Sequence, residues 1–286
     1  MKTRIISGIV LFIIVAAVLA AGIFISPVIV SFFIALISAN AVYELLKNAA
    51  GIKSNTALIG SMVYSFLNVF LLNWDYKNVP DFLNVSSPVD YNEIAHFRSS
   101  LILGTVYFIF AAVICLIKHK DFNLSQIAVL CAMPIAVSYA FSSLGTILNH
   151  DSGIYYLLLL INFSSVCDMG AYFTGVTMGK HKLCPEISPK KTVEGAVGGI
   201  ISSIIISVVI ILCFGQTEKM LITLLLTVPF CILGMIGDLF ASVIKRSVGI
   251  KDYGNLIPGH GGILDRFDSI LMIAPLLYIF IILGIL

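Results

Sequence analysis

Long apolar stretches alternate with short polar ones along the whole chain. Nine apolar stretches approach the roughly 20 residues that a helix needs to cross a bilayer. They cover approximately residues 5–25, 28–46, 57–74, 100–117, 125–148, 154–176, 195–214, 220–244 and 269–286. Continuous apolar runs favour helices over strands, and a helix satisfies its own backbone hydrogen bonds in lipid. The pattern predicts an all-α polytopic membrane protein with about nine transmembrane helices.

Composition and charge agree with this prediction and exclude a soluble globular protein. Hydrophobic residues make up 59% of the chain and charged residues 11%, against roughly 25% charged residues in soluble domains. If the N-terminus is cytoplasmic, only Lys77, Arg98 and Lys219 of the 17 Lys and Arg residues lie outside. The positive-inside rule therefore predicts a cytoplasmic N-terminus. The first run follows Lys2 and Arg4 and is too long for a signal-peptide core, so we expect a retained helix.

The two halves of the chain differ in where their charges lie. Residues 1–151 carry little charge within their apolar runs, and we interpret them as N-terminal transmembrane scaffold helices. Residues 152–286 concentrate ionisable residues near the cytoplasmic ends of their spans, a placement that usually serves function. We interpret them as the catalytic region, with its active site at the cytoplasmic membrane face. The outer connection 73–99 is expected to be a solvated loop, and a short surface helix within it is compatible with the sequence.

One helical face near the cytoplasmic end of the run 220–244 combines three kinds of polar group. Asp238, Ser242 and Lys245 follow one another at i, i+4 and i+7, and Arg246 lies beside them. Snorkelling cations at a helix end are the alternative for Lys245 and Arg246. That alternative does not suit Asp238, because a short carboxylate cannot reach far toward water.

A polar loop follows this helix and precedes the last span. It contains Lys251 and Asp252 and then the stretch GNLIPGHGG, which includes Gly261 and Gly262. Glycines allow tight turns and let backbone N–H groups approach an anion. His260 lies among them and is a candidate phosphate contact, with an ordinary structural histidine as the alternative.

Acidic residues stand at the start of the last span. Asp265, Arg266 and Asp268 precede it directly. Carboxylates are hard ligands that suit Mg²⁺, which usually takes one or two of them together with substrate phosphates. Asp238 and Asp265 come from two helix ends and form a candidate magnesium pair. Capping of the last helix is the alternative for Asp265 and especially for Asp268.

A second cluster lies upstream, in the stretch from Asp168 to Glu194. Asp168 stands near the cytoplasmic end of its run and is followed by small residues that permit close helix packing. Lys190 and Lys191 are candidate phosphate clamps, with ordinary positive-inside residues as the alternative. Carboxylates with Mg²⁺ and cations around a polyphosphate describe phosphoryl or nucleotidyl transfer. The sequence has no Walker A or protein-kinase signature.

These motifs resemble those of the phosphatidate cytidylyltransferase family, the CDP-diacylglycerol synthases. The stretch 242–268 reads S-x-I-K-R-x4-K-D-x-G-x2-I-P-x-H-G-G-I-x-D-R-F-D, and CDMGAYFTG and ISPKKTVEG precede it. The three motifs cover roughly residues 168–268. One position departs from the family pattern, because Ala241 stands where the family commonly has Glu.

The resemblance implies that CTP and phosphatidic acid give CDP-diacylglycerol and pyrophosphate, with Mg²⁺ held by Asp238 and Asp265. It also implies that Asp168 orients a cation or a second metal. The implied catalytic residues are Asp238, Lys245, Arg246, Lys251, Asp252, His260, Asp265, Arg266 and Asp268. The implied substrate-binding residues are Ser242, Lys190, Lys191, Gly261, Gly262 and Asp168. We expect the protein to lie in the lipid bilayer of a bacterial inner (cell) membrane and to have no nucleic-acid partner. The resemblance is also compatible with a homodimer.

Two other classes of function stay open at this point. A transporter would usually place its ionisable groups near the membrane midplane, whereas here they collect at the inner face. A CTP-dependent polyprenol kinase or an isoprenoid-lipid cytidylyltransferase would share the location. The full signature favours the diacylglycerol enzyme over these two.

Overall fold

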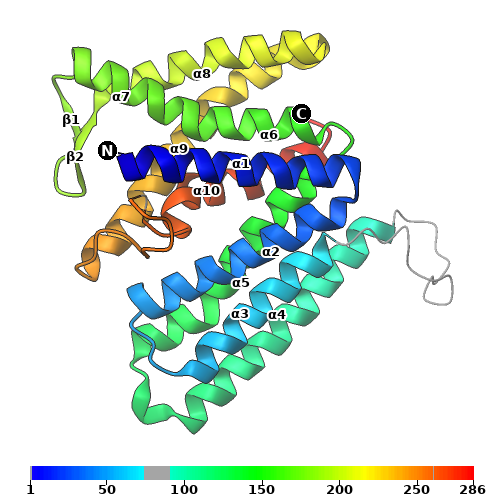
Figure 1. Ribbon diagram of the computed structural model, residues 1–286, viewed down its shortest axis with the longest axis vertical. Helices are drawn as coiled ribbons and strands as arrows, with labels where there is room; N and C mark the ends of the chain where they lie inside the picture. Colours follow the sequence, from blue (N-terminus) through cyan, green and yellow to red (C-terminus); the bar gives the residue numbers. More distant parts are fainter. Residues whose placement is uncertain (1, 74–90, 260) are drawn as a thin grey trace. The chain divides into compact units, whose positions relative to one another are not determined.

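The described residues fold mainly into helices (Figure 1). The computed structural model describes residues 2–73, 91–259 and 261–286. The α-helices are α1 Lys2–Phe24, α2 Pro27–Glu44, α3 Asn55–Leu72, α4 Tyr91–Ile117, α5 Leu124–Leu148, α6 Gly153–Ile161, α7 Cys167–Met178, α8 Val193–Phe214, α9 Met220–Ser247 and α10 Leu264–Ile282. The prediction of an all-α membrane protein is confirmed in its main feature, with one small hairpin as an exception.

Seven helical segments of the described chain are long and apolar enough to cross a membrane. They are 27–49, 55–72, 100–117, 124–148, 153–178, 193–214 and 217–247. α1 and α10 cover the other two predicted runs, so the count of nine and the orientation stay predictions. α4 starts at Tyr91, because the helix extends from its apolar run into the preceding polar residues. The rest of the outer connection, residues 74–90, lies outside the described residues.

Contacts divide the chain into two compact units. Unit 1 comprises Met1–Thr146 and Tyr253–Ile263, and unit 2 comprises Ile147–Asp252 and Leu264–Leu286. The predicted signature 242–268 is therefore shared. Its central Gly-rich loop groups with the N-terminal helices, whereas its two flanking helices belong to unit 2.

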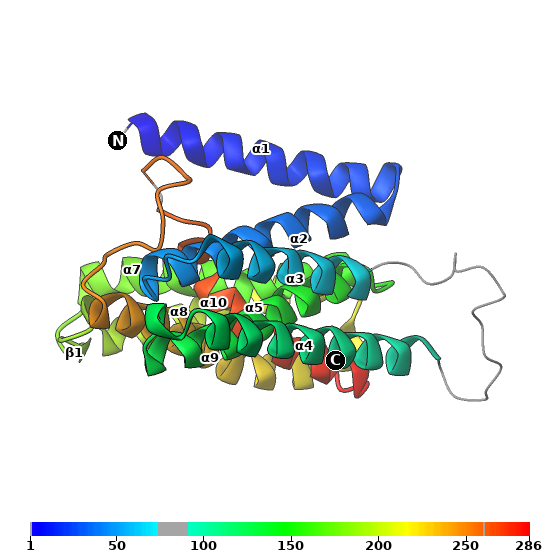
Figure 2. The ribbon, with the colours of Figure 1, turned by 90° about the horizontal axis from the view of Figure 1, so that it is seen from below.

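Unit 1 is a layered bundle in which α1 packs on α2, α2 on α3 and α3 on α4 (Figures 1 and 2). Hydrogen bonds between helices hold it together. Ser38 and Ser65 join α2 to α3 at 2.7 Å, and the Tyr107 hydroxyl donates to the Leu130 carbonyl at 2.7 Å. Small polar side chains commonly fill this role inside a bilayer, where water is absent.

Unit 2 begins with one long helical segment that contains a π-helical turn. α6 passes through Asn162–Val166 into α7, and α7 then packs along α8, α8 along α9 and α9 along α10. The buried Asn162 amide donates to the Ser203 carbonyl and to the Ser207 hydroxyl, both at 2.9 Å. π-turns inside α-helices are frequent near functional sites, and this one ends directly before Cys167 and Asp168.

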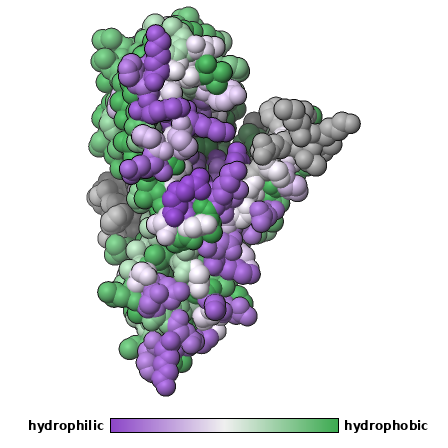
Figure 3. All heavy atoms as spheres, turned by 90° about the vertical axis from the view of Figure 1, so that its left-hand side faces the viewer, coloured by the Kyte–Doolittle hydropathy of each residue, from purple (hydrophilic) through white to green (hydrophobic). Residues whose placement is uncertain are grey.

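A short β-hairpin connects α7 to α8 and was not predicted from the sequence. β1 Lys182–Cys184 pairs antiparallel with β2 Ser188–Thr192, with Lys182 opposite Thr192. Figure 3 faces the side on which this hairpin lies and shows hydrophilic side chains gathered there, with apolar side chains on the flanks. By contrast, α9 exposes a row of large apolar side chains, as expected for lipid contact. The row is Leu221, Leu225, Ile232, Ile236 and Phe240.

Candidate functional site

The site in unit 2 depends on an unusually close approach of α7 to α8. A Cβ atom on Gly195 would lie 2.7 Å from the Ala171 carbonyl oxygen, and one on Gly199 would lie 2.5 Å from that of Cys167. Neither position leaves room for a side chain, so the two backbones touch, as small residues between membrane helices allow. The predicted role of small residues in close packing is confirmed here. The approach brings the start of α7, with Asp168, next to the start of α8.

Glu194 and Thr192 fix the hairpin to the start of α8. The Glu194 carboxylate accepts backbone N–H groups from Lys180 at 3.1 Å and from His181 at 3.1 Å, and it lies 2.6 Å from His181 Nδ1. The Thr192 hydroxyl caps α8 by accepting the Gly195 N–H at 3.1 Å. Both contacts satisfy donors that a loop or helix end leaves unpaired. The hairpin therefore holds its two lysines, Lys190 and Lys191, in fixed positions.

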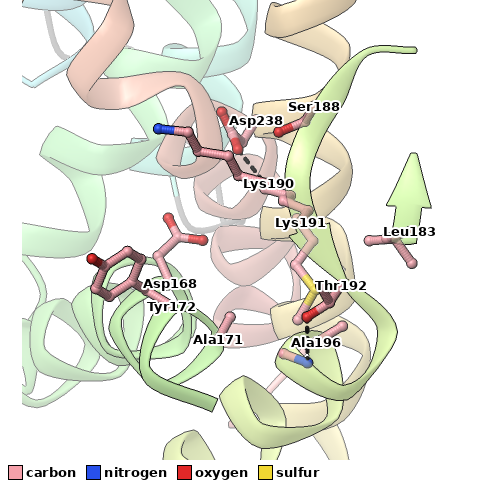
Figure 4. A pocket seen from close by; sticks show the side chains of 12 residues that line it. Asp168, Ala171, Tyr172, Leu183, Ser188, Lys190, Lys191, Thr192, Ala196 and Asp238 are labelled. Atoms are coloured by element: carbon pink, nitrogen blue, oxygen red, sulfur yellow. Dashed lines mark hydrogen bonds and ion pairs between the residues drawn. The ribbon is translucent and has the colours of Figure 1, made fainter. Parts of the chain in front are cut away.

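A pocket of about 270 Å³ opens between α7, β2 and α9 (Figure 4). Its charged lining consists of Asp168, Lys190, Lys191 and Asp238, and the Tyr172 ring and Met235 add apolar surface. Three predicted regions thus contribute to one cavity. They are the motif CDMGAYFTG with Asp168, the motif ISPKKTVEG with Lys190 and Lys191, and the helix that carries Asp238. The arrangement offers cations for phosphate groups and carboxylates for a metal ion.

The ion pair between Lys191 and Asp238 closes one wall of this pocket. Lys191 Nζ lies 2.5 Å from Asp238 Oδ2, and the two side chains are 24% and 28% exposed. The Lys191 Nζ atom is itself shielded from solvent and has no hydrogen bond with acceptable geometry to any described residue. An ammonium carries three donors, and buried donors are normally satisfied. Lys191 is therefore suited to bind a further acceptor inside the pocket, such as a phosphate oxygen.

Asp268 places a further carboxyl group near Asp238. α9 packs against α10 so that a Cβ atom on Gly237 would lie 2.8 Å from the Asp268 carbonyl oxygen. The pKa of the Asp268 carboxyl is raised to about 7, because burial disfavours its charged form and because Asp238 lies near it. Asp268 sits one turn inside α10, which begins at Leu264, so the predicted capping alternative is wrong for Asp268. No three His, Cys, Asp or Glu side chains among the described residues gather closely enough to hold a metal ion by themselves.

Asp265 forms a second, deeper ion pair. Lys245 Nζ lies 2.7 Å from Asp265 Oδ1, and the two side chains are 10% and 2% exposed. This contact ties the last turn of α9 to the first turn of α10. Neither residue lines the pocket. Whether Asp265 shares a metal ion with Asp238 stays a prediction.

The other predicted site residues occupy three places. Ser242 is half-buried on α9, while Arg246, Lys251, Asp252 and Arg266 are exposed on unit 2. Arg246 donates to the carbonyl of Ile250 at 3.1 Å. Gly261 and Gly262 belong to the loop in unit 1, and His260 lies outside the described residues.

Two carboxylates with clear structural roles were missed in the sequence. Glu194 anchors the hairpin, and Glu44 lies buried at the end of α2, where it accepts the Ile263 N–H at 3.1 Å. Glu44 had a detectable signal, because it is the one acidic residue within the apolar run 28–46. An acid inside a membrane run marks a functional position by default.

The chain matches known proteins over nearly its full length. The model of the cytidylyltransferase family matches residues 2–283. A phosphatidate cytidylyltransferase of Bacillus subtilis is 34% identical over 285 residues, which cover 97% of this chain and 96% of that protein. Relatives with the same name in Staphylococcus haemolyticus and Staphylococcus saprophyticus are 43% and 42% identical over 134 and 156 residues, or 47% and 54% of this chain. In these two alignments the chain spans little more than half the length of its relatives, 52% and 59%.

Proposed function

Because the chain belongs to the cytidylyltransferase family, we propose that it transfers CMP from CTP to phosphatidic acid, giving CDP-diacylglycerol and pyrophosphate. The observation that carries the proposal is the pocket in unit 2. It places the buried Lys191 ammonium, with donors to spare, beside the carboxylates of Asp238 and Asp168. Anionic phosphates and a cation fit these groups.

The surroundings of Asp238 fit a lipid substrate. Ile236 and Phe240 flank it on α9, and their side chains are exposed and apolar. Acyl chains can stay in the bilayer against such a surface while the phosphate headgroup reaches the pocket. We propose that the pocket faces the cytoplasm of a bacterial cell, that nine helices span the membrane and that the N-terminus is cytoplasmic.

In the proposed reaction, an oxygen of the lipid phosphate attacks the α-phosphorus of CTP. A new P–O–P bond forms, the bond from the α-phosphorus to the bridging β-oxygen breaks, and pyrophosphate leaves with the electron pair. The lipid phosphate is already ionised at neutral pH, so no strong general base is required. Lys190 and Lys191 hold phosphate groups in the pocket, and Lys245, Arg246, Lys251 and Arg266 are the further proposed phosphate contacts.

The donors present fit a magnesium ion, which we propose as the cofactor. Mg²⁺ usually takes one or two carboxylates together with substrate phosphates and water, so a three-residue protein cage is not needed. Asp238 and Asp265 would hold it, with Asp168 as a candidate for orienting a second cation. When bound, the ion offsets negative charge on the phosphates. Lys191 and Lys245 neutralise the two carboxylates in the structure described here.

The test is an assay of the purified full chain in detergent with CTP labelled in its α-phosphate, phosphatidic acid and Mg²⁺. We expect the label in the lipid product and one pyrophosphate per turnover. Asp238→Asn should lower the rate about a hundredfold to a thousandfold, because a metal ion supplies several kcal/mol. Glu218→Gln, a change of an acid at the opposite end of α9, is the matched control and should leave the rate unchanged.

Other products would contradict the proposal. CDP together with a newly phosphorylated lipid would indicate a CTP-dependent kinase. Uptake of a solute into sealed vesicles without any chemical change would indicate a transporter. Transfer of the label only to an isoprenoid lipid would replace the substrate class.

A further inference from the structure

A buried carboxylate in unit 1 lies against the Gly-rich loop of the signature. Glu44 is the last residue of α2, and the π-helical turn Leu45–Ala49 follows it directly. The residue is only 5% exposed. A carboxylate at such a position is costly unless its oxygens are bound. The contacts of Glu44 therefore indicate why the chain keeps it.

Glu44 and Asn48 together hold both ends of the loop 253–263. The Ile263 N–H donates to Glu44 Oε1 at 3.1 Å in a buried hydrogen bond. Asn48, one turn later on the same face, donates from Nδ2 to the Tyr253 carbonyl at 2.5 Å. Tyr253 itself is fully buried. The loop thus begins and ends at side chains of a single helical segment.

The glycines of the loop fall into two kinds. Gly259 and Gly261 have φ values of +78° and +85°, which side chains rarely adopt. Gly254 and Gly262 do not have positive φ. A Cβ atom at either of these two would instead overlap the Glu44 carboxylate, at 2.7 Å from its Cδ atom at Gly254 and 2.6 Å at Gly262. The Glu44 side chain therefore occupies the space that Gly254 and Gly262 leave open.

We infer that Glu44 is a positioning residue for the signature loop 253–263, even though it lies 219 residues upstream of Ile263, in the half predicted to be a scaffold. Its carboxylate fixes Ile263, which is separated from the proposed metal ligand Asp265 by Leu264 alone. Asn48 fixes Tyr253, which follows Asp252 directly. The catalytic part of the inference rests on the proposed function, whereas the structural part, that Glu44 orders the loop, does not.

The first experiment measures the order of the loop without any assay of activity. Hydrogen–deuterium exchange by mass spectrometry on the full chain in detergent compares the wild type with Glu44→Ala and Glu44→Gln. We expect at least tenfold faster exchange in peptides covering 253–263 for Glu44→Ala, and intermediate exchange for Glu44→Gln, since Gln keeps an oxygen acceptor for Ile263 N–H. Asn40→Ala is the matched control, because the Asn40 amide donates to the Leu36 carbonyl of its own helix.

The second experiment uses the packing of Glu44 against Gly262. Gly262→Ala should by itself loosen the loop, because the added methyl displaces the Glu44 carboxylate. In the Glu44→Ala background the same methyl meets empty space, so the double variant should exchange no faster than Glu44→Ala. Contacting residues give such non-additive effects, whereas independent ones add. Fully additive effects of the two substitutions would overturn the inference.

Kinetics then connect the loop to turnover. Glu44→Ala should lower kcat about tenfold to a hundredfold, as expected for a small misplacement of reacting groups, with the KM for CTP changing less than threefold. Glu44→Gln should restore much of kcat. An inactive wild type would sink the proposed function and leave the exchange result standing. Unchanged exchange in Glu44→Ala, with normal kcat, would sink the inference about Glu44.

Discussion

Two lysine–carboxylate pairs of unit 2 share one chemistry and differ in their surroundings. Lys191–Asp238 joins β2 to α9 in the wall of the pocket, and about a quarter of each side chain is exposed. Lys245–Asp265 joins α9 to α10 away from the pocket lining, and its carboxylate is almost completely buried. A partly exposed pair contributes less to stability than a fully buried one, since breaking a fully buried pair leaves a charge without compensation. We therefore assign a role in substrate binding to Lys191–Asp238, in which Lys191 also contacts a phosphate. The role assigned to Lys245–Asp265 is to fix α9 against α10.

Breaking the buried pair should give the largest effect on stability. Lys245→Met leaves the Asp265 carboxylate without its ammonium, and we expect a loss of about 3–5 kcal/mol in folding free energy. Thermal unfolding in detergent, followed by far-UV circular dichroism, measures this loss of stability. The double variant Lys245→Met, Asp265→Leu should recover most of the stability, because an apolar pair of similar volume often replaces a buried ion pair.

The same double variant separates fixation from catalysis. If Asp265 also serves the reaction, the recovered protein should stay inactive. Normal turnover in the stable double variant would remove Asp265 from the proposed metal site. An unchanged thermal midpoint in Lys245→Met would show that the buried pair does not fix the helices.

Breaking the pocket pair should act on turnover and spare stability. Lys191→Ala removes an ammonium whose donors are proposed to bind phosphate, and we expect kcat/KM to fall about tenfold to a hundredfold, or roughly 1.4–2.8 kcal/mol. The folding free energy should fall by about 1 kcal/mol at most, the upper end for an ion pair that solvent still screens. Steady-state kinetics and thermal unfolding on one preparation check both. A large loss of stability with unaltered kinetics would reverse the assigned roles.

The smallest effect is expected at the neighbouring lysine. Lys190 lines the pocket on an exposed stretch of β2 and has no ion pair within the described chain. Lys190→Ala should raise the KM for CTP about threefold at low ionic strength, and the difference should shrink in 0.5 M salt, since exposed charges are screened. A salt-independent increase would indicate a direct, desolvated contact like the one proposed for Lys191.

The sequence predicts the membrane helices and the gathering of several charged residues far better than it predicts the hairpin and the loop. Apolar runs specify helices because the bilayer leaves the backbone few alternatives, and Asp168, Lys190, Lys191 and Asp238 do line one pocket. The stretch from Lys182 to Thr192 has no strand pattern, and its hairpin depends on Glu194 accepting backbone N–H groups. Such a contact has no sequence periodicity.

The two lysine–carboxylate ion pairs could not be predicted from the sequence either. Asp238 and Lys245 share a helical face in the sequence, and their actual partners, Lys191 and Asp265, come from β2 and α10. Tertiary packing decides which cation meets which carboxylate, and several lysines and arginines were equally eligible by spacing. Glu44 was detectable as an isolated acid in an apolar run, but its partner Ile263 lies far along the chain.

The division of the chain into units has a consequence for anyone who wishes to take the protein apart. The polypeptide leaves unit 2 after Asp252, contributes Tyr253–Ile263 to unit 1 and returns at Leu264. A C-terminal fragment that begins after residue 146 would contain the segment Tyr253–Ile263 without the helices of unit 1 that it belongs with. Fragment complementation should therefore succeed only when both pieces are synthesised into the same membrane, and mixing separately purified pieces should not restore the native chain.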